Sequence, residues 1–200
     1  RYTIRSWSRL QRLFQTHHSN WRRWAFRGQT ELTLAPALEV ALKRFQQPYS
    51  AERVEENLLR EFSRHFHRIT HGLPEPRNRL EWLALMRHHG APTRLLDWSY
   101  SFWLAVYFAV ARRSRGDSTI VHGVDYRTLN RYGLRRLDPW LREEYQALPQ
   151  PDKDPELLDA VLDGQAPSVL AVNPLRLNSR LAGQQGLFLA PTTLSEPFEA

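Results

Sequence analysis

Apolar side chains recur at three- and four-residue spacing through much of the first half of the chain, as they do along one face of an α-helix. This pattern predicts amphipathic helices over residues 6–17, 37–45, 51–70 and 79–89. Gly90 provides a left-handed stop for the last of them. The most apolar helix is expected over residues 102–112, with Ser99 or Ser101 as its cap.

Short runs rich in β-branched and aromatic residues predict strands. They lie at residues 24–27, 93–98, 119–124, 168–174 and 186–191, and the last two are expected to be neighbours. Between them, residues 128–165 are charged and punctuated by proline, with two short helices, and we expect a mobile insertion there. The chain is therefore predicted to be a single α+β domain over residues 1–200, with several helices around a small mixed β-sheet.

Composition limits the chemistry that this domain can use. The 200 residues include no cysteine, which excludes disulfides, cysteine-based zinc sites and a thiol nucleophile, and fits a reducing compartment such as the cytoplasm. The net charge of +7 favours a polyanionic partner such as nucleic acid, an acidic antitoxin or immunity protein, or a phosphate-bearing substrate. Since the longest apolar run, residues 102–111, is too short to span a bilayer, we expect no membrane partner.

The tripeptide Arg27-Gly28-Gln29 ends the first predicted strand and is a candidate binding element. A glycine there allows a ligand to approach the backbone, and the flanking arginine and glutamine suit phosphate and amide groups. An ordinary turn with a surface arginine is the alternative, and it is the commoner situation for such a tripeptide taken alone.

Two histidines, His88 and His89, close the fourth predicted helix. The helix dipole favours them there without any functional role. They are also candidates for a base or a metal ligand, but no carboxylate stands at metal-ligand spacing from them. The sequence therefore predicts no metal site.

Polar residues alternate along the segment TRLLDWS, so that Thr93, Asp97 and Ser99 share one face of the predicted strand. If this face opens onto a cleft, the three side chains line it together. Alternatively, Asp97 caps the next helix or pairs with Arg27.

Two amides, Gln184 and Gln185, precede Gly186 at the start of the last predicted strand. They are suited either to a ligand or to the backbone groups of the turn. The chain contains no GxSxG, GxxxxGK[ST] or HExxH motif, which excludes a serine-hydrolase elbow, a P-loop and that class of zinc hydrolase.

Together these segments resemble the FRG domain family. The family's Phe-Arg-Gly tripeptide corresponds to Phe26-Arg27-Gly28, and its motif HxGxPTRLLDW, followed by ALYFA, corresponds to residues 88–109. Its late NPR and QQGxF segments correspond to Asn173-Pro174 and residues 184–188, with a departure at Leu175, where the family often has arginine. The resemblance spans Trp24 to Phe188.

The resemblance implies a fold similar to that of ADP-ribosyltransferases, with NAD as substrate. Arg27 would then hold the NAD pyrophosphate, Thr93 and Ser99 would steady the nicotinamide ribose, and Trp98 or Tyr107 would stack on nicotinamide. The remaining residues expected around the same ligand are Gly28, Gln29, His89 and Arg94.

The same resemblance leaves the catalytic carboxylate open. Gln185 occupies the late-strand position that usually holds glutamate, and an amide cannot act as a base. We expect Asp97 to supply the negative charge, with Glu196 or Glu199 as alternatives, or else the protein binds a nucleotide without transferring it.

The leading expectation is an NAD-consuming transferase or glycohydrolase that modifies a protein or nucleic acid as a bacterial toxin or phage-defence effector. One alternative is a non-catalytic nucleotide or nucleic-acid sensor, whose arginines bind phosphates and whose aromatic rings stack on bases. A weaker one is an endonuclease that uses His88 or His89 with Asp97, since carboxylates for a metal are sparse.

Overall fold

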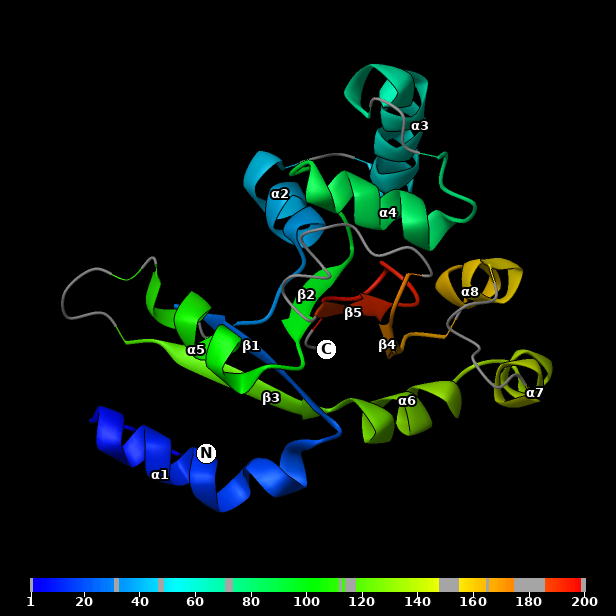
Figure 1. The fold of residues 1–200 in the computed structure, drawn as a ribbon. Coiled ribbons are helices and arrows are strands. Elements are labelled where there is room, and N and C mark those ends of the chain that lie inside the picture. The colour runs from blue at the N-terminus through cyan, green and yellow to red at the C-terminus, as the bar shows by residue number, and fades with distance from the viewer. Residues whose placement is uncertain are drawn as a thin grey trace.

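The computed structural model of the chain describes residues 2–30, 33–46, 49–70, 74–111, 113, 118–147, 155–164, 166–174 and 186–198. In this part of the chain, helices pack around a five-stranded sheet (Figure 1). The helices are α1 (Trp7–His17), the 3-10 helix η1 (His18–Trp21), α2 (Ala37–Phe45), α3 (Ala51–Ile69), α4 (Arg79–His88), α5 (Phe102–Ala111), α6 (Tyr126–Leu134), α7 (Pro139–Ala147) and α8 (Pro155–Leu162). The expectation of several helices around a small sheet is confirmed.

The strands are β1 (Trp24–Gln29), β2 (Leu96–Ser99), β3 (Ile120–Asp125), β4 (Val169–Val172) and β5 (Gly186–Pro191). They lie in the order β3-β1-β2-β5-β4, and every neighbouring pair is antiparallel. The expected mixed sheet is therefore wrong, whereas the expected pairing of the last two strands is confirmed. Helical connections often join parallel strands, but the connection through α2, α3 and α4 returns the chain antiparallel to β1.

Serine side chains cap the starts of α1 and α5, and a glycine ends α4. Ser6 Oγ accepts a hydrogen bond of 3.3 Å from the first turn of α1, and Ser101 Oγ accepts one of 3.3 Å from the first turn of α5. Ser99 Oγ instead accepts the backbone N–H of Ser101 at 3.0 Å, in the turn before α5. Gly90, with φ of 85°, is the expected left-handed residue after α4.

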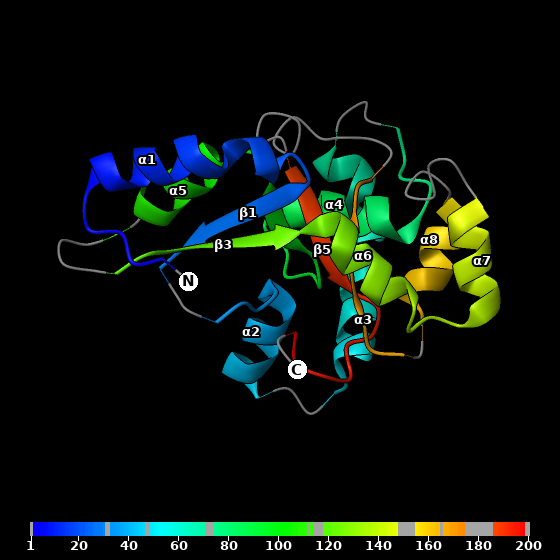
Figure 2. The same cartoon turned by 90° about the horizontal axis from the view of Figure 1, so that it is seen from below.

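Three clusters of buried apolar side chains hold the helices on the sheet. The largest joins α4, α7 and α8 to the face of β4 and β5 that carries Phe188. The second lies on the opposite face, around Trp98, where Leu129 of α6 packs, and the third joins α1 and α5 to Phe26 of β1. Figure 2 shows the result: the sheet curls, with α1 and α5 beside β1 and β3, and α7 and α8 beyond β5.

The segment of residues 128–165 contributes directly to the core. Helix α6, whose nine residues include two arginines and a glycine, was not predicted. Leu134, Leu141, Leu158 and Val161 are nevertheless at most 7% exposed, and all four belong to the largest cluster. The described part of this segment thus packs as part of the domain, and the mobility of the segment stays a prediction.

Gly28 lies directly beneath α5. A Cβ atom at Gly28 would lie 1.7 Å from the carbonyl oxygen of Ala105 and 2.7 Å from the backbone nitrogen of Ala109. This glycine was expected to let a ligand approach the backbone, a role that stays a prediction; in the fold, the residue serves the packing of a helix. It admits the backbone of α5, which lies closer to the strand than a side chain would allow.

Helix α5 is buried on one side only. Phe102, Ala105 and Ala109 are buried against β1, whereas Tyr107 and Phe108 are 59% and 41% exposed. Even so, among the described residues no helix has both the length and the apolar content to cross a bilayer.

Arg94 is the largest fully buried side chain, at 2% exposed. It lies in the segment before β2, where residues 93–95 do not continue the predicted strand. Its Nε donates to Glu55 Oε2 at 2.8 Å, its Nη2 lies 2.6 Å from the same oxygen, and its backbone N–H donates to Glu55 Oε1 at 3.2 Å. Its Nη1 donates to the carbonyl of Leu162 at 2.8 Å. Both charges are thereby satisfied inside the core.

Arg79 links the same carboxylate to α8. Its Nη2 donates to Glu55 Oε2 at 3.2 Å, its Nη1 pairs with Asp163, and its backbone N–H donates to Asp159 Oδ1 at 2.9 Å. Burial raises the pKa of Asp159, and the Asp163 charge adds to this, while the bonds and charge of Arg79 oppose it. The pKa of Asp159 is therefore higher in the folded protein than in the unfolded chain. As the pH rises from the ordinary pKa of an aspartate through this raised pKa, Asp159 ionises and the fold loses stability.

We predict that Glu55→Gln lowers the free energy of unfolding by about 3 kcal/mol, because it leaves the buried guanidinium of Arg94 without a counter-charge. Urea denaturation followed by tryptophan fluorescence measures the change. Glu56→Gln, at the exposed neighbouring position of α3, is the control and should change stability by less than about 0.5 kcal/mol. Equal stability of the two variants would contradict the role of Glu55.

We predict that Gly28→Ala destabilises the fold by about 2 kcal/mol or more, because the new methyl group must push α5 off the strand. Gly123→Ala in β3 is the matched control, since the atoms nearest to its Cβ would be side-chain atoms of Phe26 and Trp24, at 3.3 Å. Thermal unfolding should show a clearly larger loss for Gly28→Ala, and a larger loss for the control would refute this packing.

Candidate functional site

The candidate site lies where β1 and β2 separate. Among the described residues the two strands share one bridge, between Phe26 and Ser99. Beyond it, Arg27 spans the interval, and its Nη1 donates to the backbone carbonyl of Asp97 at 2.7 Å. Two predicted site residues that are distant in the sequence are therefore in direct contact.

Gln29 orients this arginine from the same strand. Its Oε1 accepts a hydrogen bond from Arg27 Nε at 2.8 Å, and its Nε2 donates to the carbonyl of Thr33 at 2.9 Å. The guanidinium is thus fixed on two sides, by the Gln29 amide and by the Asp97 carbonyl. Fixed donors of this kind suit recognition of a phosphate group.

Asp97 directs its carboxylate toward α4. Oδ2 accepts hydrogen bonds from Arg87 Nε at 3.0 Å and Arg87 Nη2 at 2.7 Å, and the two side chains are 20% and 21% exposed. Oδ1 has no hydrogen bond to any residue that the structure describes. Of the two alternatives for Asp97, neither the cap nor the carboxylate pair with Arg27 is found, because Ser101 caps α5 and Arg87 takes the carboxylate.

Arg87 is the member of the site that sequence reasoning missed. It stands in the last turn of α4, where a basic residue has a sufficient explanation in the helix dipole. The turn at Gly90 reverses the chain after α4 and brings residue 87 beside residue 97. In the sequence, Arg87 directly precedes the candidate residues His88 and His89, which was the one sign that it could belong to the site. The sequence spacing between Arg87 and Asp97 did not indicate their contact.

Other predicted residues lie within the fold. Thr93 is fully buried and its carbonyl accepts the backbone N–H of Leu38 at 3.2 Å, so it supports the start of α2. Ser99 is 5% exposed and takes part in the turn before α5.

Arg94 forms an ion pair with Glu55, which places its charge in the core and away from any cleft. His89 is exposed, with its ring 5.9 Å from that of Phe62 on α3.

The aromatic and late-strand candidates are placed differently. Trp98 is 4% exposed within the second core cluster, whereas Tyr107 is exposed on α5 beside Phe108. Gln185 and Glu199 lie outside the described residues, and Glu196 lies on the exposed C-terminal segment. Within the described ranges, no group of three or more histidine, aspartate or glutamate side chains is arranged to hold a metal ion.

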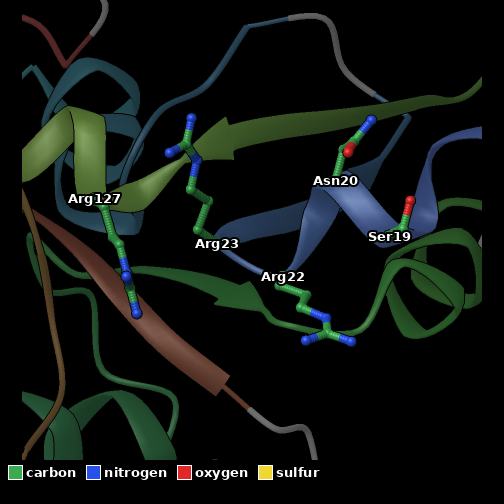
Figure 3. Close-up of a pocket in the computed structure, with 5 residues that line it drawn as sticks. All are labelled: Ser19, Asn20, Arg22, Arg23 and Arg127. Atoms are coloured by element: carbon green, nitrogen blue, oxygen red, sulfur yellow. The ribbon is translucent and has the colours of Figure 1, made fainter.

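A second polar feature was not predicted at all. Figure 3 shows a pocket of about 540 Å³ between η1, the start of β1 and the first turn of α6. Its lining residues are Ser19, Asn20, Arg22, Arg23 and Arg127. Because they come from segments more than 100 residues apart and carry no recognisable motif, nothing in the sequence groups them.

Of the comparisons with known proteins, the one with protein families found a match. No curated protein and no solved structure matches the chain. The model of the FRG domain matches residues 22–118, which include β1, α4, β2 and α5, and with them Arg27, Arg87 and Asp97. The late segments around Asn173 and Gln185 lie outside that match. The chain therefore contains an FRG domain.

Proposed function

We propose that this FRG domain is an ADP-ribosyltransferase-like effector that consumes NAD and modifies a macromolecule. The observation that carries the proposal is the contact between Arg27 and Asp97, at the point where two strands of the sheet separate. It places the Arg27 guanidinium beside the backbone of the residue that carries the Asp97 carboxylate, and a cation for phosphate and a carboxylate are the two charged groups that such a transfer needs.

Arg27 is the residue proposed to bind the pyrophosphate of NAD. Its hydrogen bonds to Gln29 and to the Asp97 carbonyl hold the guanidinium in one orientation before any ligand arrives. A pre-oriented fork loses little side-chain entropy on binding a phosphate. Gln29 acts here as a positioning residue.

Asp97 is the proposed catalytic carboxylate. Arg87 holds one carboxylate oxygen, which leaves Oδ1 to face a substrate. As the acceptor's nucleophile forms its bond to ribose C1′, Oδ1 would take the nucleophile's proton, and nicotinamide would leave with the electrons of the broken C1′–N bond. With water as acceptor, the same step is NAD hydrolysis.

The late strand supports the same location. Gly186 at the start of β5 lies opposite Ser99 of β2, so the chain enters β5 beside the end of the site strand. Gln185 immediately precedes Gly186 in the sequence, and we propose that its amide binds substrate, since it cannot take a proton from the acceptor.

The biological setting belongs to the same proposal. A basic effector with a net charge of +7 suits a cytoplasmic toxin or phage-defence protein whose acceptor is a protein or nucleic acid. An acidic antitoxin or immunity protein is the partner that this charge would attract.

We predict that the protein releases nicotinamide from NAD in the presence of cell lysate, and that Asp97→Asn lowers this rate by about a hundredfold or more, because the amide cannot accept a proton. Arg27→Lys should raise the NAD concentration needed for half-maximal rate by about tenfold, since lysine offers no fork to the pyrophosphate. Chromatography of nicotinamide and transfer of labelled ADP-ribose are the measurements.

Glu61→Gln, on the exposed surface of α3, is the control for Asp97→Asn because it removes the same charge from another element of the fold. Thermal unfolding of each variant distinguishes a lost proton acceptor from a lost fold. No nicotinamide release by the wild type, or full activity of a folded Asp97→Asn variant, would refute the proposal.

A further inference from the structure

The pocket between η1, β1 and α6 is lined entirely by polar side chains, three of them arginines. No aromatic or aliphatic residue is among the described residues that line it, so no ring would stack inside it. Its occupant is therefore expected to be a charged or strongly polar group. The charge of the three guanidiniums favours an anion.

One of these arginines is already neutralised. Arg23 Nε lies 2.7 Å from Asp125 Oδ2. Burial raises the pKa of Asp125, but the Thr128 hydrogen bonds and the Arg23 charge outweigh burial and lower it below the ordinary value. Asp125 is consequently ionised at neutral pH, and its charge is used by Arg23 and the start of α6.

The other two arginines have no counter-charge. Arg22 and Arg127 are exposed, and neither makes an ion pair or side-chain hydrogen bond to a residue that the structure describes. In Figure 3 both side chains extend away from that of Arg23. Two cations that line one pocket repel each other, and a polyanion would relieve this repulsion.

An exposed ring is linked to the pocket through Tyr126, the neighbour of Arg127 in the sequence. The backbone N–H of Tyr126 donates to the carbonyl of Arg23 at 3.2 Å, which fixes the start of α6 to the start of β1. The Tyr126 ring packs edge-on against Tyr100, with centroids 5.4 Å apart. Tyr100 remains 38% exposed, and its hydroxyl accepts a hydrogen bond from Asn173 at 3.0 Å.

We propose that this surface binds single-stranded nucleic acid, with Arg22 and Arg127 on backbone phosphates and Tyr100 stacked on an unpaired base. Free cations beside an exposed aromatic ring are the combination that single-strand-binding proteins use. In a duplex the bases are already stacked on one another, so Tyr100 has no partner there. The site is separate from the Arg27 site and its binding needs no NAD.

The test is fluorescence anisotropy with a labelled single-stranded oligouridine of about ten nucleotides, in the absence of NAD. The double variant Arg22→Ala/Arg127→Ala should bind about tenfold more weakly or worse. Its plot of log affinity against log salt should be shallower by about 1.4, since two phosphate contacts are lost.

The charge-matched control is Arg60→Ala/Arg64→Ala on α3, where both side chains are 68% exposed and pair with residues of the same helix. This control should keep the wild-type salt slope. An equal loss of slope in both double variants would overturn the proposal, because it would show a response to net charge alone.

The stacking contact has its own variant. Tyr100→Leu should lower the affinity by about fivefold or more while keeping the salt slope, because a base contact is lost and no phosphate contact is. Tyr132→Leu, at a 62% exposed tyrosine of α6, is the control and should bind as the wild type does.

A duplex of the same length should bind more weakly than the single strand. Equal affinity for the two would overturn the single-strand assignment, and no binding of either would overturn the site. Because NAD is absent throughout, these results stand whether or not the domain turns out to consume NAD.

Discussion

The burial of the Glu55 carboxylate is the constraint on which the other parts of the structure depend. A carboxylate with no exposed surface must be paired, and its partners come from Arg94 before β2 and Arg79 at the start of α4. Arg94 also donates to the carbonyls of Leu162, the last residue of α8, and of Thr192 after β5. One ion cluster thus fixes three helices and the ends of two strands, since a shift in any of them would leave a buried charge unpaired.

The candidate site is a consequence of this arrangement. Leu96 begins β2 two residues after Arg94, so the fixed arginine determines where β2 meets β1. The single bridge between these strands leaves an interval for Arg27, and α4, fixed through Arg79, delivers Arg87 to Asp97. Gln29, Arg27, Asp97 and Arg87 are therefore linked by hydrogen bonds in a row. This row lies where the backbone pairing between β1 and β2 ends.

Sequence pattern alone was sufficient for the parts of this fold that local physics decides. The helix over 37–45, the αL stop at Gly90 and the two late strands were predicted, because periodicity and backbone preference act within one element. The antiparallel sheet and the contact of Arg87 with Asp97 were not, because each depends on how distant elements pack. Helix α6 was missed for a related reason: its burial is set by β4, which follows it by more than thirty residues.

The positions of the arginines and glycine of the motif also bear on how such a motif is interpreted. Gly28 and Arg94 are explained by packing, since one admits α5 and the other neutralises Glu55. Asp97 differs. Its Oδ2 accepts two hydrogen bonds from Arg87, whereas its Oδ1 has no hydrogen-bond partner among the described residues. A polar atom that the fold holds in place without a hydrogen-bond partner is available for a ligand. The same reasoning selects Arg22 and Arg127, near the opposite end of β1. Neither arginine belongs to the motif. Unused polar atoms, more than membership of the motif, are therefore the basis of both binding proposals.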